Sequence, residues 1–589
     1  MRLRAGLVVL LAVVMLLGGR LVWLQGLQPE AYAERSGVQR TREVVLRAER
    51  GAVLDRNGFP LALSVVAKNV YAEPRLIQSA TCTPTSATPC DPAGIAAKVA
   101  PLLGLDVAEV REQLELDRAF VYLKRSVEPA VAQRVLDLRL PGVGGETTSR
   151  RVHPSRDLAA GVLGFTDFEG VGKAGIELAY DTLLAGKDGL RLAQFDKQGR
   201  VIPTGRDSLQ AAVPGKDVML TIDRDLQWYA QDLLARQVAE TRAVNGSVVV
   251  MDVRTGEVLA LATAPSYDPD NRKGVDGATL GNPAVSDVFE PGSVNKVITA
   301  AVALEAGIVT PASVVVVPPT YKVGNHTLHD AEKHPLERMT FAGVLAKSSN
   351  IGTVKVAEKV GPQRLVDAMK AFGFGERSGL GLPGESPGLL REPDDWSVTS
   401  IGTIPIGQGV STNAIQVASV YATLANGGVR VTPTIVKATR DSAGHLSPSR
   451  AATTRKVVSP RVARQITTML ESVVTEDGTA PKAAIPGYRV AGKTGTAQRV
   501  ATEGKRAGRY DGTYTSSFIG FAPADAPRFV TAVILQGTGK RGHYGGQVAA
   551  PVFAKVMGFA LRAYGVPPSG RPSPVLRLMA DDPARPAHR

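Results

Sequence analysis

The stretch Glu290-Pro-Gly-Ser293-Val-Asn-Lys296, followed by an apolar run to Leu304, marks the passage from a turn into a helix. A proline and a glycine are ordinary punctuation before a helix start. Ser293 therefore lies at or near the helix N-terminus, and Lys296, three residues on, shares its face. A serine hydroxyl is a good nucleophile only when a base takes its proton. Lys296 suits that task if burial or a second cation lowers its pKa from about 10.4 towards neutrality.

Two later stretches supply partners for this pair. Ser348-Ser-Asn350 lies between two helical runs, so its hydroxyl and amide suit proton relay and contact with a peptide group. Considered alone, the same residues are better explained as a Ser/Asn helix cap. Lys493-Thr-Gly-Thr496 follows a strand-like approach and offers a second cation and two hydroxyls. Each stretch is common by chance, so the prediction depends on all three occurring together.

The third stretch also fits a phosphate-binding loop. Residues Gly487 to Thr494 match the pattern G-x-x-x-x-G-K-[ST]. That loop needs flexible residues between a strand and a helix, whereas Tyr-Arg-Val-Ala favours a strand here and Gly-Thr follows where a helix should begin. The pattern therefore does not predict nucleotide binding.

Taken together, Ser293-x-x-Lys296, Ser348-x-Asn350 and Lys493-Thr494-Gly495 resemble the three-motif set of penicillin-binding proteins and serine β-lactamases. The resemblance covers nearly the whole chain. Its further parts are the segment from Arg50 to Gly58, which looks like an N-terminal signature of class B members, Leu220-Thr-Ile-Asp223, and Gly407-Gln-Gly409 with the run from Ala414 to Ala418. A structural role is preferred for the first and the third of these parts.

The resemblance implies a peptidoglycan D,D-transpeptidase without a cofactor or a metal. Ser293 would attack the carbonyl between two terminal D-alanines of a stem peptide, and Lys296 would accept its proton. Ser348 and Lys493 would help protonate the leaving D-alanine. The expected substrate-binding residues are Asn350, Thr494, Gly495 and Thr496, and the N–H groups of Ser293 and Thr496 would form the oxyanion hole. β-Lactams would bind, acylate Ser293 and inhibit the enzyme.

The resemblance also implies an α+β fold. A transpeptidase domain, like that of serine β-lactamases, with an antiparallel sheet flanked by helices would follow an elongated N-terminal pedestal domain and one transmembrane helix. We expect a cytoplasmic N-terminus at residues 1–4, a transmembrane anchor at 5–27 and the pedestal at 28–215. The transpeptidase domain is expected at 216–564 and a disordered tail at 565–589. The apolar spacing predicts helices at 95–103, 130–138 and 226–239, and a hairpin at 247–262.

The N-terminus determines the compartment. The apolar run from Ala5 to Leu24 spans a bilayer if Arg20 snorkels at one interface. Arg2 and Arg4 favour a cytoplasmic N-terminus, which places the remainder outside the cytoplasmic (inner) membrane. A cleaved signal peptide is the alternative, because Ala31-Tyr-Ala fits a cleavage site, although it lies well past the apolar run.

Small clusters of reactive residues remain. The two cysteines, Cys82 and Cys90, lie in a Pro/Thr-rich stretch, where a loop-closing disulfide is favoured outside the cytoplasm. His326, His329 and His334 have metal-like spacing, but no complete ligand set accompanies them, so a solvated loop is preferred.

The net charge of +14 comes without a dense basic tract, so nucleic acid is not an expected partner. By resemblance, the partners are stem peptides on lipid-linked precursor strands, the membrane, β-lactams, a glycosyltransferase of the shape, elongation, division and sporulation (SEDS) family and other division proteins. The segments from Arg151 to Pro154 and from Gly172 to Glu177 look most like the septal type. An elongation-specific transpeptidase is the close alternative. A β-lactam sensor or a division scaffold without turnover is the alternative from a different class.

Overall fold

The computed structural model describes residues 2–23, 41–80, 89–194, 202, 207–501, 508–539 and 542–581. The chain forms two compact units. One consists of Met1–Arg50 and Ala185–Gly215, and the other of Gly51–Leu184 and Lys216–Arg589.

The first unit contains an apolar helix and a small sheet. Helix α1 (Arg2–Val22) contains the segment Arg4–Val22, which is long and apolar enough to cross a membrane and is not buried by the protein. The sheet consists of β1 (Thr41–Leu46), β6 (Gly189–Gln194) and β7 (Asp207–Gln210), with β6 in the centre and both pairings antiparallel. An exposed helix of this composition indicates a membrane segment.

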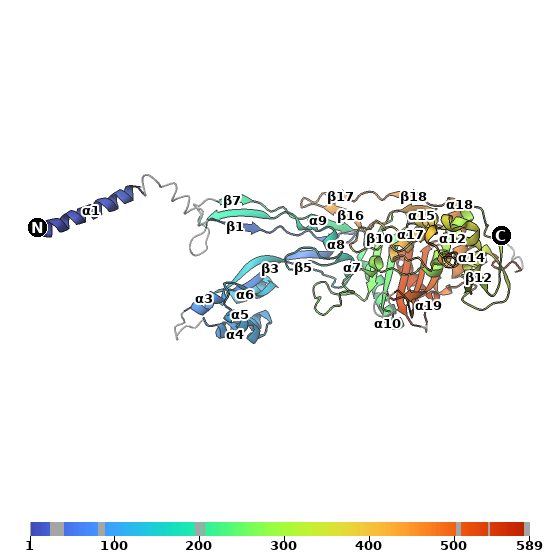
Figure 1. Ribbon diagram of the computed structural model, residues 1–589, viewed down its shortest axis with the longest axis horizontal. Coiled ribbons are helices and arrows are strands. Elements are labelled where there is room, and N and C mark those ends of the chain that lie inside the picture. The colour runs from blue at the N-terminus through green and yellow to red at the C-terminus, as the bar shows by residue number, and fades with distance from the viewer. Residues whose placement is uncertain are drawn as a thin grey trace. The chain divides into compact units, whose positions relative to one another are not determined.

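A five-stranded antiparallel sheet is the centre of the second unit (Figure 1). Its strands are, in spatial order, β10 (Val258–Ala264), β9 (Asn245–Asp252), β21 (Phe529–Thr538), β20 (Tyr510–Ala522) and β19 (Ala491–Val500). The strands β9 and β10 are the hairpin predicted from the sequence. β19 forms one edge of the sheet, so one side of its backbone is not paired with another strand of this sheet.

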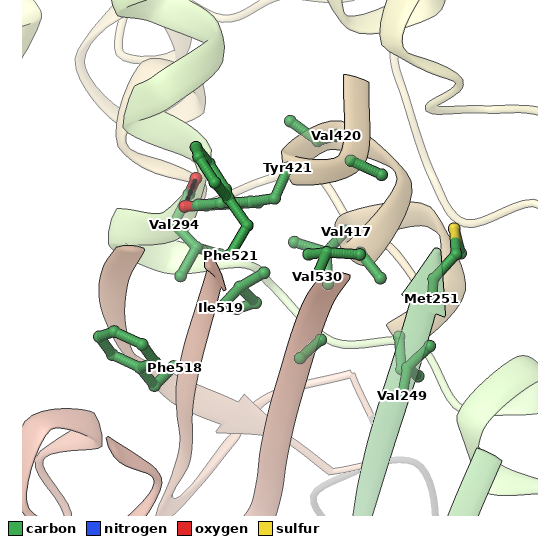
Figure 2. Packing of buried hydrophobic residues seen from close by; sticks show 14 of the residues in the cluster. Val249, Met251, Val294, Val417, Val420, Tyr421, Phe518, Ile519, Phe521 and Val530 are labelled. Atoms are coloured by element: carbon green, nitrogen blue, oxygen red, sulfur yellow. Dashed lines mark hydrogen bonds between the residues drawn. The ribbon is translucent and has the colours of Figure 1, made fainter. Parts of the chain in front are cut away.

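Helices pack on both faces of this sheet. α10 (Arg224–Thr241) and α20 (Ala550–Ala563) cover one face, where Phe518 meets Phe553 with ring centroids 4.7 Å apart. α17 (Ala414–Ala425) covers the other face, and Figure 2 shows Ile519 and Val530 directed towards its residues. Successive strand residues point to opposite faces, which is why Phe518 and Ile519 serve different layers. The predicted antiparallel sheet flanked by helices is confirmed.

A separate lobe of the second unit precedes the large sheet. Its strands are β3 (Pro60–Ala72), β4 (Val121–Val127) and β5 (Val143–Val152), and its helices are α3 (Pro74–Ser79), α4 (Pro92–Leu103), α5 (Val107–Glu115) and α6 (Pro129–Leu136). The helices enclose a small apolar core of their own. α4 and α6 confirm the two helices expected in this region. Cys90 is disulfide-bonded, while Cys82 lies outside the described residues.

The remaining elements are short. The strands are β2 (Val53–Leu54), β8 (Asp217–Leu220), β11 (Val314–Val317), β12 (Tyr321–Val323), β13 (His326–Leu328), β14 (Glu337–Thr340), β15 (Val429–Val431), β16 (Val436–Arg440), β17 (Leu446–Pro448) and β18 (Thr454–Lys456). The α-helices are α7 (Ala160–Leu163), α8 (Gly175–Ala179), α9 (Asp181–Ala185), α11 (Pro283–Ser286), α12 (Lys296–Glu305), α13 (Phe341–Ala346), α14 (Asn350–Val360), α15 (Pro362–Phe372), α16 (Ser400–Thr403), α18 (Pro460–Glu471) and α19 (Gly545–Val548). The 3₁₀ turns are η2 (Gly292–Asn295), η3 (Pro393–Asp395), η4 (Ile404–Ile406), η5 (Ser472–Val474) and η6 (Pro481–Ala483).

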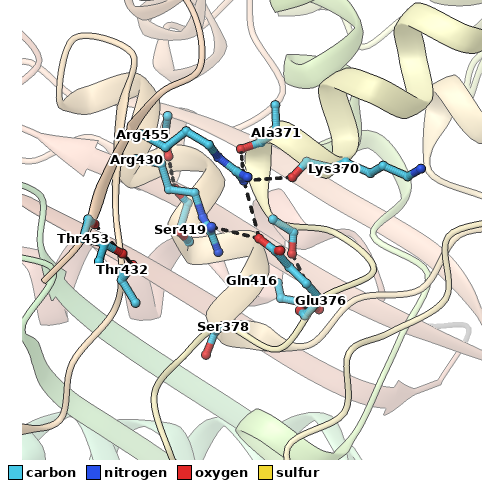
Figure 3. A network of polar contacts seen from close by, with 12 residues as sticks. Lys370, Ala371, Glu376, Ser378, Gln416, Ser419, Arg430, Thr432, Thr453 and Arg455 are labelled. Carbon is cyan, nitrogen blue, oxygen red and sulfur yellow. Dashed lines mark hydrogen bonds and ion pairs between the residues drawn. The ribbon is translucent and has the colours of Figure 1, made fainter.

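A polar network fixes α17 against the loop that follows α15 (Figure 3). Arg430 and Arg455 both donate to Oε1 of Glu376, at 3.0 and 3.4 Å. Nε2 of Gln416, in the first turn of α17, donates to the carbonyl oxygens of Glu376 and Pro387, each at 2.8 Å. α17 also contacts the turn that carries Ser293, so this network helps to hold that turn in position.

The C-terminal segment corrects one prediction. The tail expected to be disordered from residue 565 packs on the domain over residues 565–581. Thr340 donates its N–H to the carbonyl of Leu578 at 2.9 Å, and Ala580 donates to the carbonyl of Arg338 at 2.7 Å. Leu578 is buried. We call residues 565–581 the strap. Its many Pro and Arg residues gave no sign of ordered packing, because an extended segment needs only an occasional apolar side chain and a free strand edge to bind.

Gly343 on α13 is the position where the strap comes closest. A Cβ there would lie 2.0 Å from the carbonyl oxygen of Leu578. Gly343→Ala should lower the free energy of unfolding by about 1–3 kcal/mol, although alanine favours a helix by about 1 kcal/mol over glycine. Thermal unfolding of the full chain in detergent measures the change. Gly277→Ala is the control, since a Cβ there meets no atom within 4 Å. Equal stability of the two variants would contradict the packing of the strap.

Candidate active site

The turn that carries Ser293 packs closely against the segment around Gly407. Ser293 is half-buried in η2, and Lys296 begins α12. Gly292 has a φ of 58° and donates its N–H to the carbonyl of Gly407 at 3.0 Å. A Cβ at Gly407 would lie 2.2 Å from the carbonyl oxygen of Gly292, so only glycine permits this approach. The expected structural role of the Gly407 segment fits this contact.

Lys296 joins the first stretch to the second. Its Nζ donates to the carbonyl oxygen of Ser348 at 2.6 Å, to Oγ of Ser348 at 3.2 Å and to Oδ1 of Asn350 at 2.7 Å. Ser348 has a φ of 62°, a left-handed conformation that is costly for a residue other than glycine. Its neighbour Ser349 caps α14 through the N–H of Gly352. The helix cap is therefore supplied by Ser349, the residue between Ser348 and Asn350, while a functional role for Ser348 and Asn350 stays a prediction.

The third stretch lies on β19 and approaches the nucleophile turn closely. A Cβ at Gly495 would lie 3.0 Å from Cγ1 of Val294 and 3.1 Å from the carbonyl oxygen of Pro291. Lys493 is fully buried, and its Nζ lies 3.3 Å from the carbonyl oxygen and from Oγ1 of Thr494. A continuous strand through Lys493 excludes the loop-then-helix geometry of a phosphate-binding loop.

The threonines of β19 are tied to neighbouring turns. Oγ1 of Thr494 lies 2.9 Å from Oγ1 of Thr479, and Oγ1 of Thr496 accepts a hydrogen bond from the N–H of Gly545 at 3.3 Å. Thr494 is buried, while Thr496 is half-buried. The hydroxyl groups therefore stand in fixed positions along the strand.

Burial determines the electrostatics of the site. It lowers the pKa of Lys296 to about 7, with the negative charge of Asp330 opposing the shift. Burial, together with the positive charge of Lys296, lowers the pKa of Lys493 well below its ordinary value. The two amines therefore favour a state in which they do not both carry a proton. A neutral amine beside Ser348, in the same turn as Ser293, is the arrangement needed to activate a hydroxyl.

The histidine cluster does not form a metal centre. Within the described ranges, no group of three or more His, Cys, Asp or Glu side chains gathers in a way that could hold an ion. His326 and His329 are exposed, as expected of a solvated loop. His334 is not, since only 11% of its side chain is exposed. The prediction of a solvated loop is therefore wrong for His334.

Comparison with known proteins identifies the family. The penicillin-binding protein transpeptidase domain matches residues 246–558, and the penicillin-binding protein dimerisation domain matches residues 45–220. The chain belongs to the class B penicillin-binding proteins.

Several relatives of this class B protein match over nearly their whole length. PbpB of Mycobacterium tuberculosis is 38% identical, with 98% of this chain and 87% of the relative covered. The peptidoglycan D,D-transpeptidase FtsI of Escherichia coli is 36% identical, over 95% and 91% of the two chains. The crystal structure of penicillin-binding protein 3 of Mycobacterium tuberculosis complexed with aztreonam has a TM-score of 0.70 at 34% identity, over 91% of this chain and 100% of that one.

Sequence reasoning missed the residues that support the nucleophile turn of this class B protein. Tyr421 on α17 is fully buried and donates its hydroxyl to the carbonyl of Val294 at 3.0 Å (Figure 2). Nδ2 of Asn295 donates to the carbonyl of Ile404 at 2.9 Å. A tyrosine within the run from Ala414 to Ala425 looks like any core aromatic, so the sequence contains no signal for this contact.

Proposed function

We propose that this class B penicillin-binding protein is a peptidoglycan D,D-transpeptidase that cross-links stem peptides through an acyl-enzyme on Ser293. One observation supports this proposal most. The buried amine of Lys296, three residues after Ser293, contacts both Ser348 and Asn350. The activity agrees with the name of the Escherichia coli relative, the peptidoglycan D,D-transpeptidase FtsI.

In the first half-reaction, Oγ of Ser293 attacks the carbonyl carbon between the two terminal D-alanines. The neutral amine of Lys296 accepts the hydroxyl proton as the new C–O bond forms. The N–H groups of Ser293 and Thr496 stabilise the oxyanion, and loss of one such donor typically costs about 100- to 1,000-fold in rate. The peptide C–N bond then breaks, and the leaving D-alanine amine takes a proton relayed through Ser348 and Lys493.

In the second half-reaction, an amine of a neighbouring stem peptide attacks the ester of Ser293. The amine loses its proton to the same relay, and the serine hydroxyl is restored. Asn350 binds the backbone of the donor peptide, and Thr494 and Thr496 bind its terminal carboxylate. Gly495 is the fourth proposed substrate-binding residue, and its lack of a Cβ leaves room for the protein's own side chains, since a Cβ there would lie 2.3 Å from Oγ of Ser517.

β-Lactams are inhibitors of this reaction in the proposal. Structures of a relative from Mycobacterium tuberculosis exist in complex with aztreonam and with ampicillin. The same reaction on Ser293 of this chain opens the lactam ring, and no leaving group departs. The acyl-enzyme therefore persists.

The helix and the family support the proposed location and partners. The apolar helix α1, the one helix of the described residues that is long and apolar enough to span a bilayer, anchors the protein in the inner membrane, with Arg2 and Arg4 on the cytoplasmic side and the catalytic domain outside. The substrates are stem peptides on lipid-linked precursor strands. A SEDS-family glycosyltransferase that supplies the glycan strands, together with other division proteins, is the proposed assembly, and septum synthesis is the proposed role. Elongation is the second candidate role.

Ser293→Ala should abolish covalent labelling by a fluorescent penicillin, because the Ser293 hydroxyl is the group that is acylated in the proposal. Labelling of the full chain in detergent, read after denaturing electrophoresis, measures this outcome. Ser449→Ala, at an exposed serine, is the matched control and should label fully. Label retained in Ser293→Ala would contradict the assignment of the nucleophile. A wild-type protein that does not label would favour a scaffold without acylation chemistry.

The pH dependence of acylation should follow the protonation of Lys296. The amine accepts a proton only when it is neutral, and its pKa is lowered to about 7. The second-order rate constant for acylation should therefore rise roughly tenfold per pH unit below this value and level off above it. Stopped-flow measurement with the fluorescent penicillin from acidic to alkaline pH checks the profile. A rising limb near the ordinary lysine value of 10.5 would contradict it.

Depletion of the protein from dividing cells should produce filaments without septa, and a fluorescent fusion should gather at the division site. Time-lapse microscopy measures both. Cells that become round while they continue to divide would contradict the septal role and favour the elongation-specific alternative.

A further inference from the structure

The loop between β13 and β14 covers the start of α14. It carries Asp330, whose side chain is only 9% exposed. Oδ1 of Asp330 accepts hydrogen bonds from the backbone N–H groups of Asn350 at 2.6 Å and Ile351 at 3.0 Å. A carboxylate at this position also faces the positive end of the α14 dipole. The carboxylate therefore fixes the backbone of the first turn of α14.

The same loop also holds the side chain of Asn350. Its Nδ2 donates to the carbonyl oxygen of His329 at 2.9 Å, while its Oδ1 accepts from Nζ of Lys296 at 2.7 Å. Both ends of the amide are therefore engaged, which fixes its orientation. Because Asn350 is a direct partner of the Lys296 amine, the loop determines where that amine lies.

His334 lies behind the carboxylate. Its Nδ1 is 2.7 Å from the carbonyl oxygen of Pro335, which can only accept, so Nδ1 carries a proton. Its Nε2 is buried and lies 3.3 Å from Oδ2 of Asp330. Glu337 stands on the far side, with Oε2 3.9 Å from Nδ1. The ring therefore packs against the Asp330 carboxylate without a hydrogen bond from Nε2, while Oδ1 keeps its two backbone donors.

We propose that Asp330 is a positioning residue for the acylation step. Its carboxylate fixes Asn350, and with it the amine of Lys296, and its charge sets the pH range over which that amine accepts the proton of Ser293. The inference rests on the proposed transpeptidase function and adds a residue outside the three motifs.

The charged groups around Lys296 determine the direction in which Asp330 shifts the pKa of that amine. Asp330 is the anion that raises the pKa of Lys296 against the effect of burial. Lys493 faces the amine from β19, and the other partners, Ser348 and Asn350, are neutral. Asp330 itself faces Lys296, His334 and the N-terminus of α14. Removal of its charge leaves burial and Lys493 unopposed, so the amine loses its proton at lower pH.

Asp330→Asn separates the two parts of the role. The asparagine retains an oxygen that can accept from the backbone of Asn350 and Ile351 but lacks the charge. The rising limb of the acylation profile should move to lower pH by about half a unit or more, which is about a threefold gain on the limb relative to the plateau. Asp330→Ala, which also loses the acceptor, should lower the plateau by about tenfold.

Asp106→Asn is the matched control. Asp106 caps α5 in the same way, accepting from the N–H groups of Ala108 at 2.8 Å and Glu109 at 3.2 Å, in the separate lobe. This variant should keep the wild-type limb and plateau. The measurement uses the full chain in detergent, the fluorescent penicillin and stopped-flow acylation rates, with thermal unfolding recorded for every variant.

The outcomes separate this inference from the function on which it rests. Wild-type protein that acylates, with an Asp330→Asn limb that is unchanged or moves to higher pH, overturns the role of Asp330 and leaves the transpeptidase proposal intact. Wild-type protein that does not acylate overturns both. A limb that also moves in Asp106→Asn assigns the shift to general helix stability and overturns the inference as well.

Discussion

Two lysine amines, those of Lys296 and Lys493, are buried within electrostatic range of one another, and the rest of the site depends on this constraint. Both side chains are almost fully removed from solvent. A buried ammonium without a carboxylate partner is expensive, and a second one beside it costs more. The protein meets this cost by lowering both pKa values, so that a neutral amine is available near Ser293. Burial therefore makes lysine a base at neutral pH.

Close backbone approaches bring the two amines together. β19 can lie against the turn that carries Ser293 because Gly495 has no Cβ. That turn can also lie against the segment around Gly407, because Gly407 has no Cβ either. Tyr421 then closes the turn from below through its hydrogen bond to Val294. These contacts involve backbone atoms and uncharged side chains, so they fix position without adding charge to a region that already contains two buried amines. Helix α17, which carries Tyr421, is in turn held by the Glu376 network.

Local patterns predicted the hairpin of β9 and β10, several helices and the residues of the three motifs, whereas the antiparallel sheet as a whole was predicted from the family resemblance. The spacing of Ser293 and Lys296 belongs to one helix start, and the hairpin of β9 and β10 is a short-range signal, so both could be read directly. The long-range contacts were not readable. Leu578 and Thr340 are hydrogen-bonded although they lie 238 residues apart in the sequence. No periodicity in a Pro/Arg-rich tail indicates that it pairs with a strand edge. Asp330 looked like a member of a solvated loop because its hydrogen-bond donors belong to the start of α14, twenty residues away.

The pKa of Lys296 in the uninhibited protein is the measurement that tests this account most directly. Full-length protein labelled with ¹³C at the lysine ε-carbon, with a Lys296→Arg variant to assign the signal, allows its titration to be followed by NMR. The account predicts a chemical-shift change centred at about 7. A signal that remains that of an ammonium up to the ordinary lysine value of 10.5 would show that burial does not produce a base at this position, and would contradict the mechanism.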